Sequence, residues 1–248
     1  MDANHGPARL STRARRCATK VKVSPSLHVR AERFALRSAF RISRGAKTNA
    51  ELVVAELRDG VAVGLGEGVP YARYGETVAS VVRQLEAAAE RLAAGASLEA
   101  VAADLPPGAA ANALDCAGWD LQARRLGRSV ADLLGRPRPG PMTTAVTIAL
   151  DTPEAMAAAA EAVAGAALLK VKLDGDDPAA RLQAVAAAAP DARLIVDANE
   201  AWTPAILEAM AGVVARLNVA VIERPLPAGQ DDALRGLAFP APLCADES

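Results

Sequence analysis

Three acidic residues in the second half of the chain each follow a short apolar run. They lie about 25 residues apart, which is roughly the length of one strand-plus-helix unit. They are Asp197 in LIVDANE, Glu223 in VAVIERP and Asp246 in PLCADES. One similar step upstream, the run LLKVKL carries Lys170 and Lys172. Residues two apart in a strand face the same side, so the two ammonium groups project together. The pattern predicts that these side chains converge at the carboxyl-terminal edge of one parallel sheet.

The second half alternates apolar strands with alanine-rich helices. Thr152-Pro153 and Thr203-Pro204 each place a capping hydroxyl before a proline at the first helical position. Continuous apolar strands alternating with helices indicate a parallel sheet covered by helices. Five strands are expected after residue 139, whereas a closed (β/α) barrel needs eight. The expected fold class is therefore α/β, with a partial TIM-type barrel made of its first five strands.

The first half has a different order, strands first and then helices, which indicates an α+β unit. The expected strands and helices occupy residues 21–29, 50–57, 76–94, 98–104 and 112–126. Asp59-Gly60 is a hairpin signal, and the proline- and glycine-dense stretch GRPRPGP marks a domain boundary. We expect a basic, disordered extension at 1–20, an α+β domain at 21–138 and a partial barrel with a metal site at 139–248.

Charge and composition argue against several function classes. A net charge of −1 and 3% aromatic residues give no basic surface or stacking platform, so no nucleic-acid partner is expected. No apolar run approaches the ~20 residues that cross a bilayer, so no membrane partner is expected either. Cys116 and Cys244 are interpreted as buried thiols, and scattered cysteines favour the cytoplasm. The segment GLGEG (64–68) lacks the spacing of a dinucleotide loop. A homo-oligomer is left open.

Asp197, Glu223 and Asp246 suit a hard divalent cation. Mg²⁺ takes oxygen ligands, usually a few carboxylates, with substrate and water completing its shell; Mn²⁺ is the alternative ion. None of the three acids has a His or Cys partner at metal-ligand spacing, which argues against zinc and copper. The competing interpretation is that each is an ordinary strand-end acid beside a helix N-terminus.

The two lysines are candidate catalytic residues. A free lysine has a pKa of about 10.4 and is a poor base at neutral pH. A second ammonium on the same strand face disfavours protonation of its neighbour. Lys172 is therefore the candidate base, and Lys170 the cation that steadies a substrate carboxylate. The competing interpretation is a solvated strand end.

Four motifs, KVK, DAN, ERP and ADES, resemble the muconate-lactonizing branch of the enolase superfamily, in which a KxK strand precedes Asp, Glu and Asp metal ligands on the next three strands. Longer stretches are similar to the dipeptide epimerases that interconvert L-Ala-D-Glu and L-Ala-L-Glu. These stretches are FRISRGAKT (40–48), PYARYGE (70–76), NALDCAGWDLQARR (112–125), DANEAW and PLCADES. The resemblance spans roughly residues 30–248 and keeps its order.

The resemblance implies 1,1-proton transfer at the α-carbon of a dipeptide. Mg²⁺ and a lysine hold the substrate carboxylate and stabilise an enediolate. One lysine removes the α-proton and a second, on the opposite face, returns it. Lys172 matches the first of these. In the family the second follows the next strand, past residue 248, so we expect a C-terminally truncated fragment that is poorly soluble and essentially inactive by itself.

The resemblance also implies that the first domain caps the barrel mouth and sets specificity through two loops, at residues 44–48 and 71–75. Lys47 is the expected contact for an anionic side chain such as glutamate, with Arg44 and Tyr74 as further substrate-binding residues. Muconate cycloisomerase and N-acylamino acid racemase are the alternative activities, since they use the same core with different loops.

One residue beside the predicted metal ligands stands out. Arg224 directly follows Glu223, where many members of the resembled family have glutamine. It adds a positive charge near the site, and sequence reasoning assigns it no role.

Overall fold

The computed structural model describes residues 25–43 and 45–246, so the expected extension at 1–20 lies outside the described residues. The chain divides into two compact units, Met1–Arg30 with Val53–Gly127, and Ala31–Leu52 with Arg128–Ser248. Strands β1 (Ser26–Ile42) and β2 (Gly45–Asp59) are long and contribute to both units. The second unit thus contains residues 31–42 of β1 and 45–52 of β2 as well as the parallel sheet.

The first unit contains a three-stranded sheet in the order β1-β2-β3. Strand β3 (Ala62–Gly68) runs antiparallel to β2, and Asp59 lies opposite Ala62. The predicted hairpin is confirmed, but its two-residue connection is Gly60-Val61 rather than Asp59-Gly60, because Asp59 pairs with Ala62. Gly60 has a φ of 59°, which glycine adopts without the steric cost of a Cβ.

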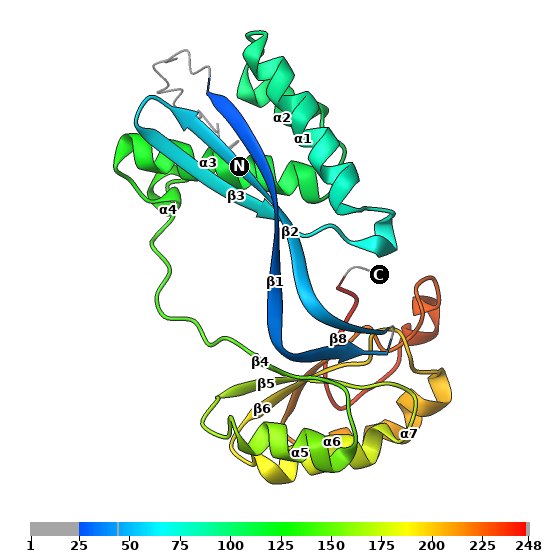
Figure 1. Cartoon of the computed structure of the whole chain (residues 1–248). Coiled ribbons are helices and arrows are strands. Elements are labelled where there is room, and N and C mark those ends of the chain that lie inside the picture. Colours follow the sequence, from blue (N-terminus) through cyan, green and yellow to red (C-terminus); the bar gives the residue numbers. More distant parts are fainter. Residues whose placement is uncertain (1–24, 44, 247–248) are drawn as a thin grey trace, which may run out of the picture. The chain divides into compact units, whose positions relative to one another are not determined.

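Helices cover this sheet (Figure 1). They are α1 (Val78–Ala93), α2 (Leu98–Asp104) and α3 (Ala109–Leu126), with the 3-10 turn η1 (Ala72–Tyr74) before them. Thr77 caps α1 by accepting a hydrogen bond from the amide of Ser80. Helix α3 begins three residues before its predicted start, because Glu76 Oε1 accepts from the amide of Ala109 at 2.7 Å. Local sequence spacing does not reveal so distant a cap.

Strand β3 packs directly on the backbone of α3 through alternating glycines, Gly64, Gly66 and Gly68. A Cβ on Gly66 would lie 2.1 Å from the carbonyl oxygen of Ala113, and Gly64 and Gly68 are as closely approached. GLGEG is therefore a packing motif, in which the missing side chains let helix and strand backbones meet.

Polar side chains of α3 also cover the free edge of β3. Asp120 Oδ2 accepts from the amide of Leu65 at 2.9 Å, and Asn112 Nδ2 donates to the carbonyl oxygen of Glu67 at 2.9 Å. Arg124 Nε in turn donates to Asp120. Edge groups left unpaired invite association with other chains, so these contacts close the sheet on this side.

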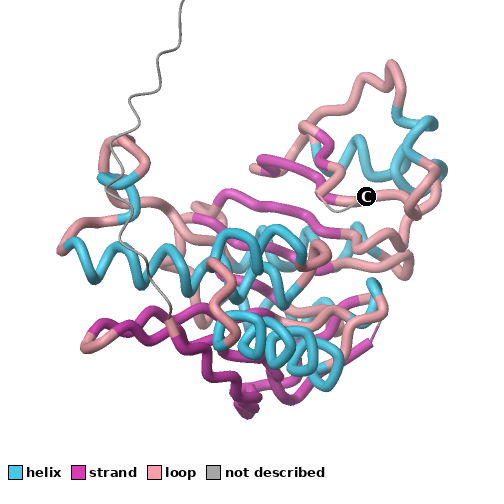
Figure 2. Tube along the Cα trace, turned by 90° about the horizontal axis from the view of Figure 1, so that it is seen from above, coloured by secondary structure: helices cyan, strands magenta, loops and turns pink. Residues whose placement is uncertain are grey.

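The second unit is built on five parallel strands in the order β4-β5-β6-β7-β8, which confirms the predicted partial barrel sheet. The strands are β4 (Val146–Ile148), β5 (Leu168–Lys172), β6 (Arg193–Asp197), β7 (Val219–Glu223) and β8 (Leu243–Cys244). Helices α5 (Pro153–Glu161), α6 (Pro178–Ala188) and α7 (Pro204–Val214) lie along one face of the sheet (Figure 1). Strands and helices alternate along the trace (Figure 2). The short helices α4 (Val130–Leu133) and η2 (Asp231–Leu234) complete the unit.

The predicted helix starts are confirmed. Thr152 and Thr203 cap α5 and α7 through their hydroxyls, and a proline follows each. On β5 the alternating Leu169 and Val171 are fully buried in the core between sheet and helices. Lys170 and Lys172 consequently face the other side of the sheet.

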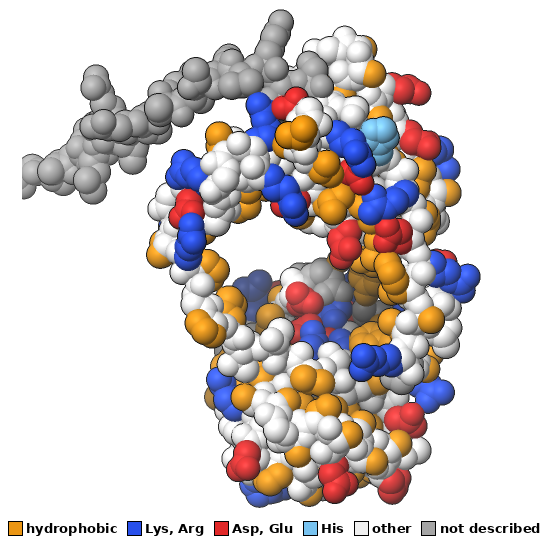
Figure 3. Space-filling view, turned by 60° about the vertical axis from the view of Figure 1, so that its left-hand side comes forward, with side chains coloured by type: hydrophobic (Ala, Val, Ile, Leu, Met, Phe, Trp, Pro, Cys, Tyr) orange, Lys and Arg blue, Asp and Glu red, His pale blue; other side chains and the backbone are white. Residues whose placement is uncertain are grey.

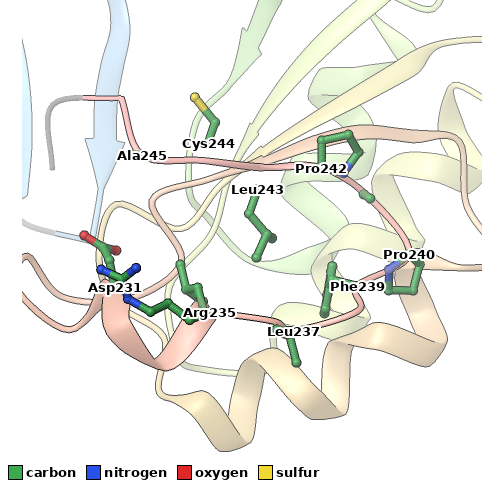
Figure 4. Close-up of a pocket in the computed structure, with 11 residues that line it drawn as sticks. Asp231, Arg235, Leu237, Phe239, Pro240, Pro242, Leu243, Cys244 and Ala245 are labelled. Carbon is green, nitrogen blue, oxygen red and sulfur yellow. The ribbon is translucent and has the colours of Figure 1, made fainter.

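A hollow of about 700 Å³ lies beside β8, lined mainly by apolar residues, with Asp231 and Arg235 at one end (Figure 4). None of the predicted site residues lines it. Leu243 and Cys244 point to opposite sides of the strand there (Figure 4), and Leu243 packs on the core. This hollow is therefore separate from the predicted chemistry.

The prediction of buried thiols is wrong, since Cys116 and Cys244 are both exposed. Cys116 lies beside Gly66 at the border of the contact between α3 and β3, and Cys244 lies on the side of β8 opposite Leu243. Basic and acidic side chains are interspersed on the face seen in Figure 3. Within the described residues, no helix combines the length and apolar character needed to span a membrane.

Candidate functional site

The predicted site residues of the parallel sheet lie at the carboxyl-terminal ends of its strands, because these strands end in register. Lys172 pairs with Asp197, and Asp197 with Glu223. Glu223 then pairs with Cys244, two residues before Asp246. Four neighbouring strands thus bring lysines and acids together at their carboxyl ends, as the sequence spacing predicted.

Asp197 is the most enclosed of these residues, with no exposed surface. Its Oδ2 lies 2.5 Å from Lys172 Nζ, 3.0 Å from Arg224 Nη2 and 3.2 Å from Lys170 Nζ. Its Oδ1 accepts from the amide of Asn199 at 2.9 Å. Burial opposes ionisation, but the Lys172 ammonium, the Asn199 amide and the Arg224 charge outweigh it and lower the pKa of Asp197 to about 2.

Glu223 faces Lys170 rather than Lys172. Lys170 Nζ lies 2.7 Å from the Glu223 carboxylate. Burial raises the pKa of Glu223, and the Asp197 charge and a hydrogen bond with Asp246 add to this rise against the opposing effect of Lys170. Burial also opposes the charged form of Lys170, yet its hydrogen bond to Glu223 and the charge of Asp197 raise the pKa of its ammonium. This agrees with a Lys170 that stays charged.

Arg224 belongs to the same cluster. Its side chain is 5% exposed, and its backbone has a φ of 43°. Besides Asp197, its guanidinium lies 3.5 Å from Glu223 Oε1 and 3.6 Å from Asp246 Oδ2. Sequence reasoning noted this residue without a role, because nothing in linear spacing shows that its side chain turns back over three acids.

The end of the β1–β2 hairpin also approaches this edge within the second unit. The ring of Phe40 lies with its centroid 6.0 Å from Lys172 Nζ, and Ser43 Oγ donates to the carbonyl oxygen of Asn199 at 3.1 Å. The amide of Leu150 donates to the carbonyl oxygen of Arg41. The sequence pointed to the stretch 40–48, but not to Phe40 or Ser43.

The three predicted substrate contacts stay predictions. Lys47 lies on β2 and is exposed. Arg44 lies outside the described residues. Tyr74 belongs to the first unit, is 57% exposed and packs edge-to-face on Tyr71, with ring centroids 5.5 Å apart.

The donor set fits a hard divalent cation in kind, since Asp197, Glu223 and Asp246 offer carboxylate oxygens at one sheet edge. Their present geometry is different: across residues 25–43 and 45–246, no three His, Cys, Asp or Glu side chains are arranged to hold a metal ion. The carboxylates are directed instead at Lys170, Lys172 and Arg224. Metal ligation therefore requires these ion pairs to rearrange.

Two family models match the chain in sequence order. The N-terminal domain of mandelate racemase / muconate lactonizing enzyme matches residues 25–135, and the enolase C-terminal domain-like family matches residues 154–248. The two matches cover most of the part of the chain that the structure describes.

Two relatives have named activities. The chain is 47% identical over 219 residues to the L-Ala-D/L-Glu epimerase of Escherichia coli (strain K12), a match that covers 88% of this chain and 68% of that protein. It is 43% identical over 199 residues to the N-acetyl-D-glutamate racemase of a Pseudoalteromonas species, covering 79% and 63%. The chain thus spans about two thirds of the length of the first and less than two thirds of the second.

Solved structures agree. An enolase family member from Agrobacterium tumefaciens, described as homologous to dipeptide epimerases and bound to sodium and L-Ala-L-Glu, matches with a TM-score of 0.84 and 45% identity over 89% of this chain and 68% of that one. The dipeptide epimerase of Enterococcus faecalis, complexed with Mg and L-Leu-L-Tyr, matches with a TM-score of 0.75 and 27% identity over 85% and 63%. In sequence and in fold, this chain belongs to the mandelate racemase / muconate lactonizing enzyme family of the enolase superfamily.

Proposed function

We propose that this protein is an isomerase that moves the α-proton of an N-acylated glutamate, with the dipeptide L-Ala-D/L-Glu as its substrate and an enediolate as its intermediate. The observation that carries the proposal is the meeting of Lys170 and Lys172 with Asp197 and Glu223 at one sheet edge. The named relatives support the substrate class, since one acts on L-Ala-Glu and one on N-acetylglutamate.

Each residue of the cluster has a proposed role. Asp197, Glu223 and Asp246 would hold Mg²⁺, or Mn²⁺, which supplies positive charge to the substrate carboxylate and so acidifies the α-proton. Lys170, whose pKa is raised, contributes a second positive charge to that carboxylate. Lys172 takes the α-proton at Nζ. In this structure Lys172 Nζ donates to Asp197, and as the base it would accept the α-proton through its lone pair.

The sheet supplies acid–base groups from one side. Both lysines on the described strands of the five-stranded sheet come from β5, and residues two apart in a strand face the same way. They approach a bound substrate from a single face. We therefore expect exchange of the α-proton of one epimer with solvent to depend on this strand.

The test measures exchange and epimerisation separately. The 248-residue chain is incubated in D₂O with Mg²⁺ and either L-Ala-L-Glu or L-Ala-D-Glu, and NMR follows α-deuteration and epimer ratio. We expect deuteration of one epimer, reduced at least ~100-fold in Lys172→Met. Absence of exchange with both epimers, or exchange that survives Lys172→Met, would contradict the proposal.

A second candidate is racemisation of N-acetylglutamate, favoured by the 43% identity to the Pseudoalteromonas enzyme. L-Ala-Glu and N-acetylglutamate both present an acylated glutamate, so one side-chain contact serves both. A panel of L-Ala-L-Glu, N-acetyl-L-glutamate and muconate separates these activities from cycloisomerisation. Faster turnover of muconate than of both glutamates would reject the substrate class.

Lys47, Arg44 and Tyr74 are proposed to bind the substrate, with Lys47 facing the glutamate side chain. Lys47→Ala is expected to raise KM for L-Ala-L-Glu and to leave KM unchanged for L-Leu-L-Tyr, whose side chains are uncharged. An equal rise for both substrates would point to a general structural defect. The proposed compartment is the cytoplasm, supported by the small number of scattered cysteines.

A further inference from the structure

Arg224 lies among the three predicted metal ligands in the way a bound cation would. Its guanidinium is 3.0 Å from Asp197, 3.5 Å from Glu223 and 3.6 Å from Asp246. The three carboxylates of the cluster are matched by three cationic side chains, Lys170, Lys172 and Arg224. The ion pairs of Arg224 reach all three acids.

The backbone holds Arg224 in this place. Its amide donates to the carbonyl oxygen of Cys244 at 2.8 Å, and its carbonyl oxygen accepts from the amide of Glu200 at 2.9 Å. The residue is thus tied to β8 and to the segment that follows β6. Because the main chain is fixed on both sides, the guanidinium leaves the acids only by rotation of its own side chain.

Asp197, the most buried of the three predicted ligands, also has several close cationic contacts. Asp197 has no exposed surface, its Oδ1 accepts from the Asn199 amide, and its Oδ2 carries three cationic contacts. An incoming divalent ion must displace at least one of them to reach an oxygen. A lysine ammonium is able to lose its proton, but a guanidinium stays charged throughout the range in which proteins fold. Only movement removes the charge of Arg224.

We propose that Arg224 is a built-in counter-cation of the carboxylate cluster, which holds Asp197, Glu223 and Asp246 together without a metal and competes with a divalent ion for them. This inference rests on the proposed function, because it takes the three acids as metal ligands. Its consequence is that Arg224 weakens metal binding: an incoming ion meets a positive charge a few ångströms from its ligands.

The test is metal affinity, measured without substrate. Binding of Mn²⁺ to the 248-residue chain is followed by electron paramagnetic resonance of the free ion, and binding of Mg²⁺ by calorimetry. Arg224→Gln is expected to bind Mn²⁺ at least ~10-fold more tightly than the parent. Arg224→Met, which fills similar space without charge, is expected to do the same. Arg224→Lys keeps the charge and is expected to stay within ~3-fold of the parent.

The matched control is Arg181→Gln. Arg181 is also an enclosed arginine, 13% exposed, and its Nη1 lies 2.8 Å from Asp174, which is not one of the three acids. Its loss should leave Mn²⁺ affinity unchanged. Circular dichroism and thermal unfolding without metal check that each variant is folded.

Two results would overturn the inference, and they are distinguishable from failure of the proposed function. If Asp197→Asn abolishes Mn²⁺ binding while Arg224→Gln and Arg224→Met leave it unchanged or weaker, the metal site stands and the counter-cation is rejected. If Asp197→Asn has no effect in either the parent or the Arg224→Gln background, the ligand assignment fails, and the counter-cation fails with it.

Discussion

The contact between β3 and α3 and the carboxyl-terminal edge of the parallel sheet are both built from short sequence motifs, yet they are constrained by different physics. At the first, Gly66 is required because a Cβ would meet the carbonyl oxygen of Ala113. At the second, Asp197 is held by charge compensation from Lys172, Lys170 and Arg224. We therefore expect substitutions at the first to act on stability, and substitutions at the second to act on binding and chemistry.

The largest expected effect on stability comes from Gly66→Ala. The added Cβ would lie 2.1 Å from a backbone oxygen, so helix and strand must separate. We expect the free energy of unfolding, measured in urea, to fall by about 3 kcal/mol or more. Gly140→Ala is the control, since a Cβ there meets no atom within 4 Å. Equal effects of the two substitutions would show that the close approach does not constrain β3.

Lys172→Met should reduce proton exchange strongly and stability only slightly, in contrast to Gly66→Ala. Loss of the base is expected to reduce α-deuteration at least ~100-fold, as stated above. Asp197 keeps Lys170 and Arg224 as partners, so the loss of stability should be smaller than in Gly66→Ala. A protein that unfolds as readily as Gly66→Ala would show that the charged edge is also a main support of the fold.

A smaller loss of stability is expected at the covered edge of β3. Asp120→Ala leaves the amide of Leu65 without its side-chain acceptor and removes the partner of Arg124. We expect a loss of about 1 kcal/mol in urea unfolding. Asp115→Ala, an exposed acid on the same helix, should change stability by less than ~0.5 kcal/mol. Equal losses of stability in the two variants would show that the loss comes from the change in charge on α3 and not from the hydrogen bond to Leu65.

The smallest effect on stability is expected at the exposed ion pair between Arg138 and Asp132, which contrasts with the buried charges around Asp197. Arg138 donates to Asp132, and with Ser129 it lowers the pKa of that carboxyl. The stabilisation is therefore present above the unfolded pKa, near 3.9, and is lost as pH falls through the lower folded value. The thermal midpoint of Asp132→Asn should lie slightly below the parent at pH 7, with the gap closing in stronger acid. A gap that widens on acidification would contradict this sign.

Local sequence patterns predicted many of the strands, helices and turns. The strand–helix alternation, the Thr-Pro caps and the hairpin signal each depend on neighbouring residues, so they predicted the elements well. The start of α3 was missed because its cap comes from Glu76, more than thirty residues away. The exposure of Cys116 was missed because its position beside Gly66, at the border of the contact between α3 and β3, depends on tertiary packing that helical spacing does not show.

The sequence by itself determined that Lys170, Lys172, Asp197 and Glu223 meet, because parallel strands of regular spacing end at the same edge. Only the tertiary structure decided how they pair: Lys172 with Asp197, Lys170 with Glu223, and Arg224 across the acids. Spacing along a chain selects the strand end at which a residue lies. The distances that govern ion pairing depend on side-chain direction and burial, which are set by the packing of several strands at once.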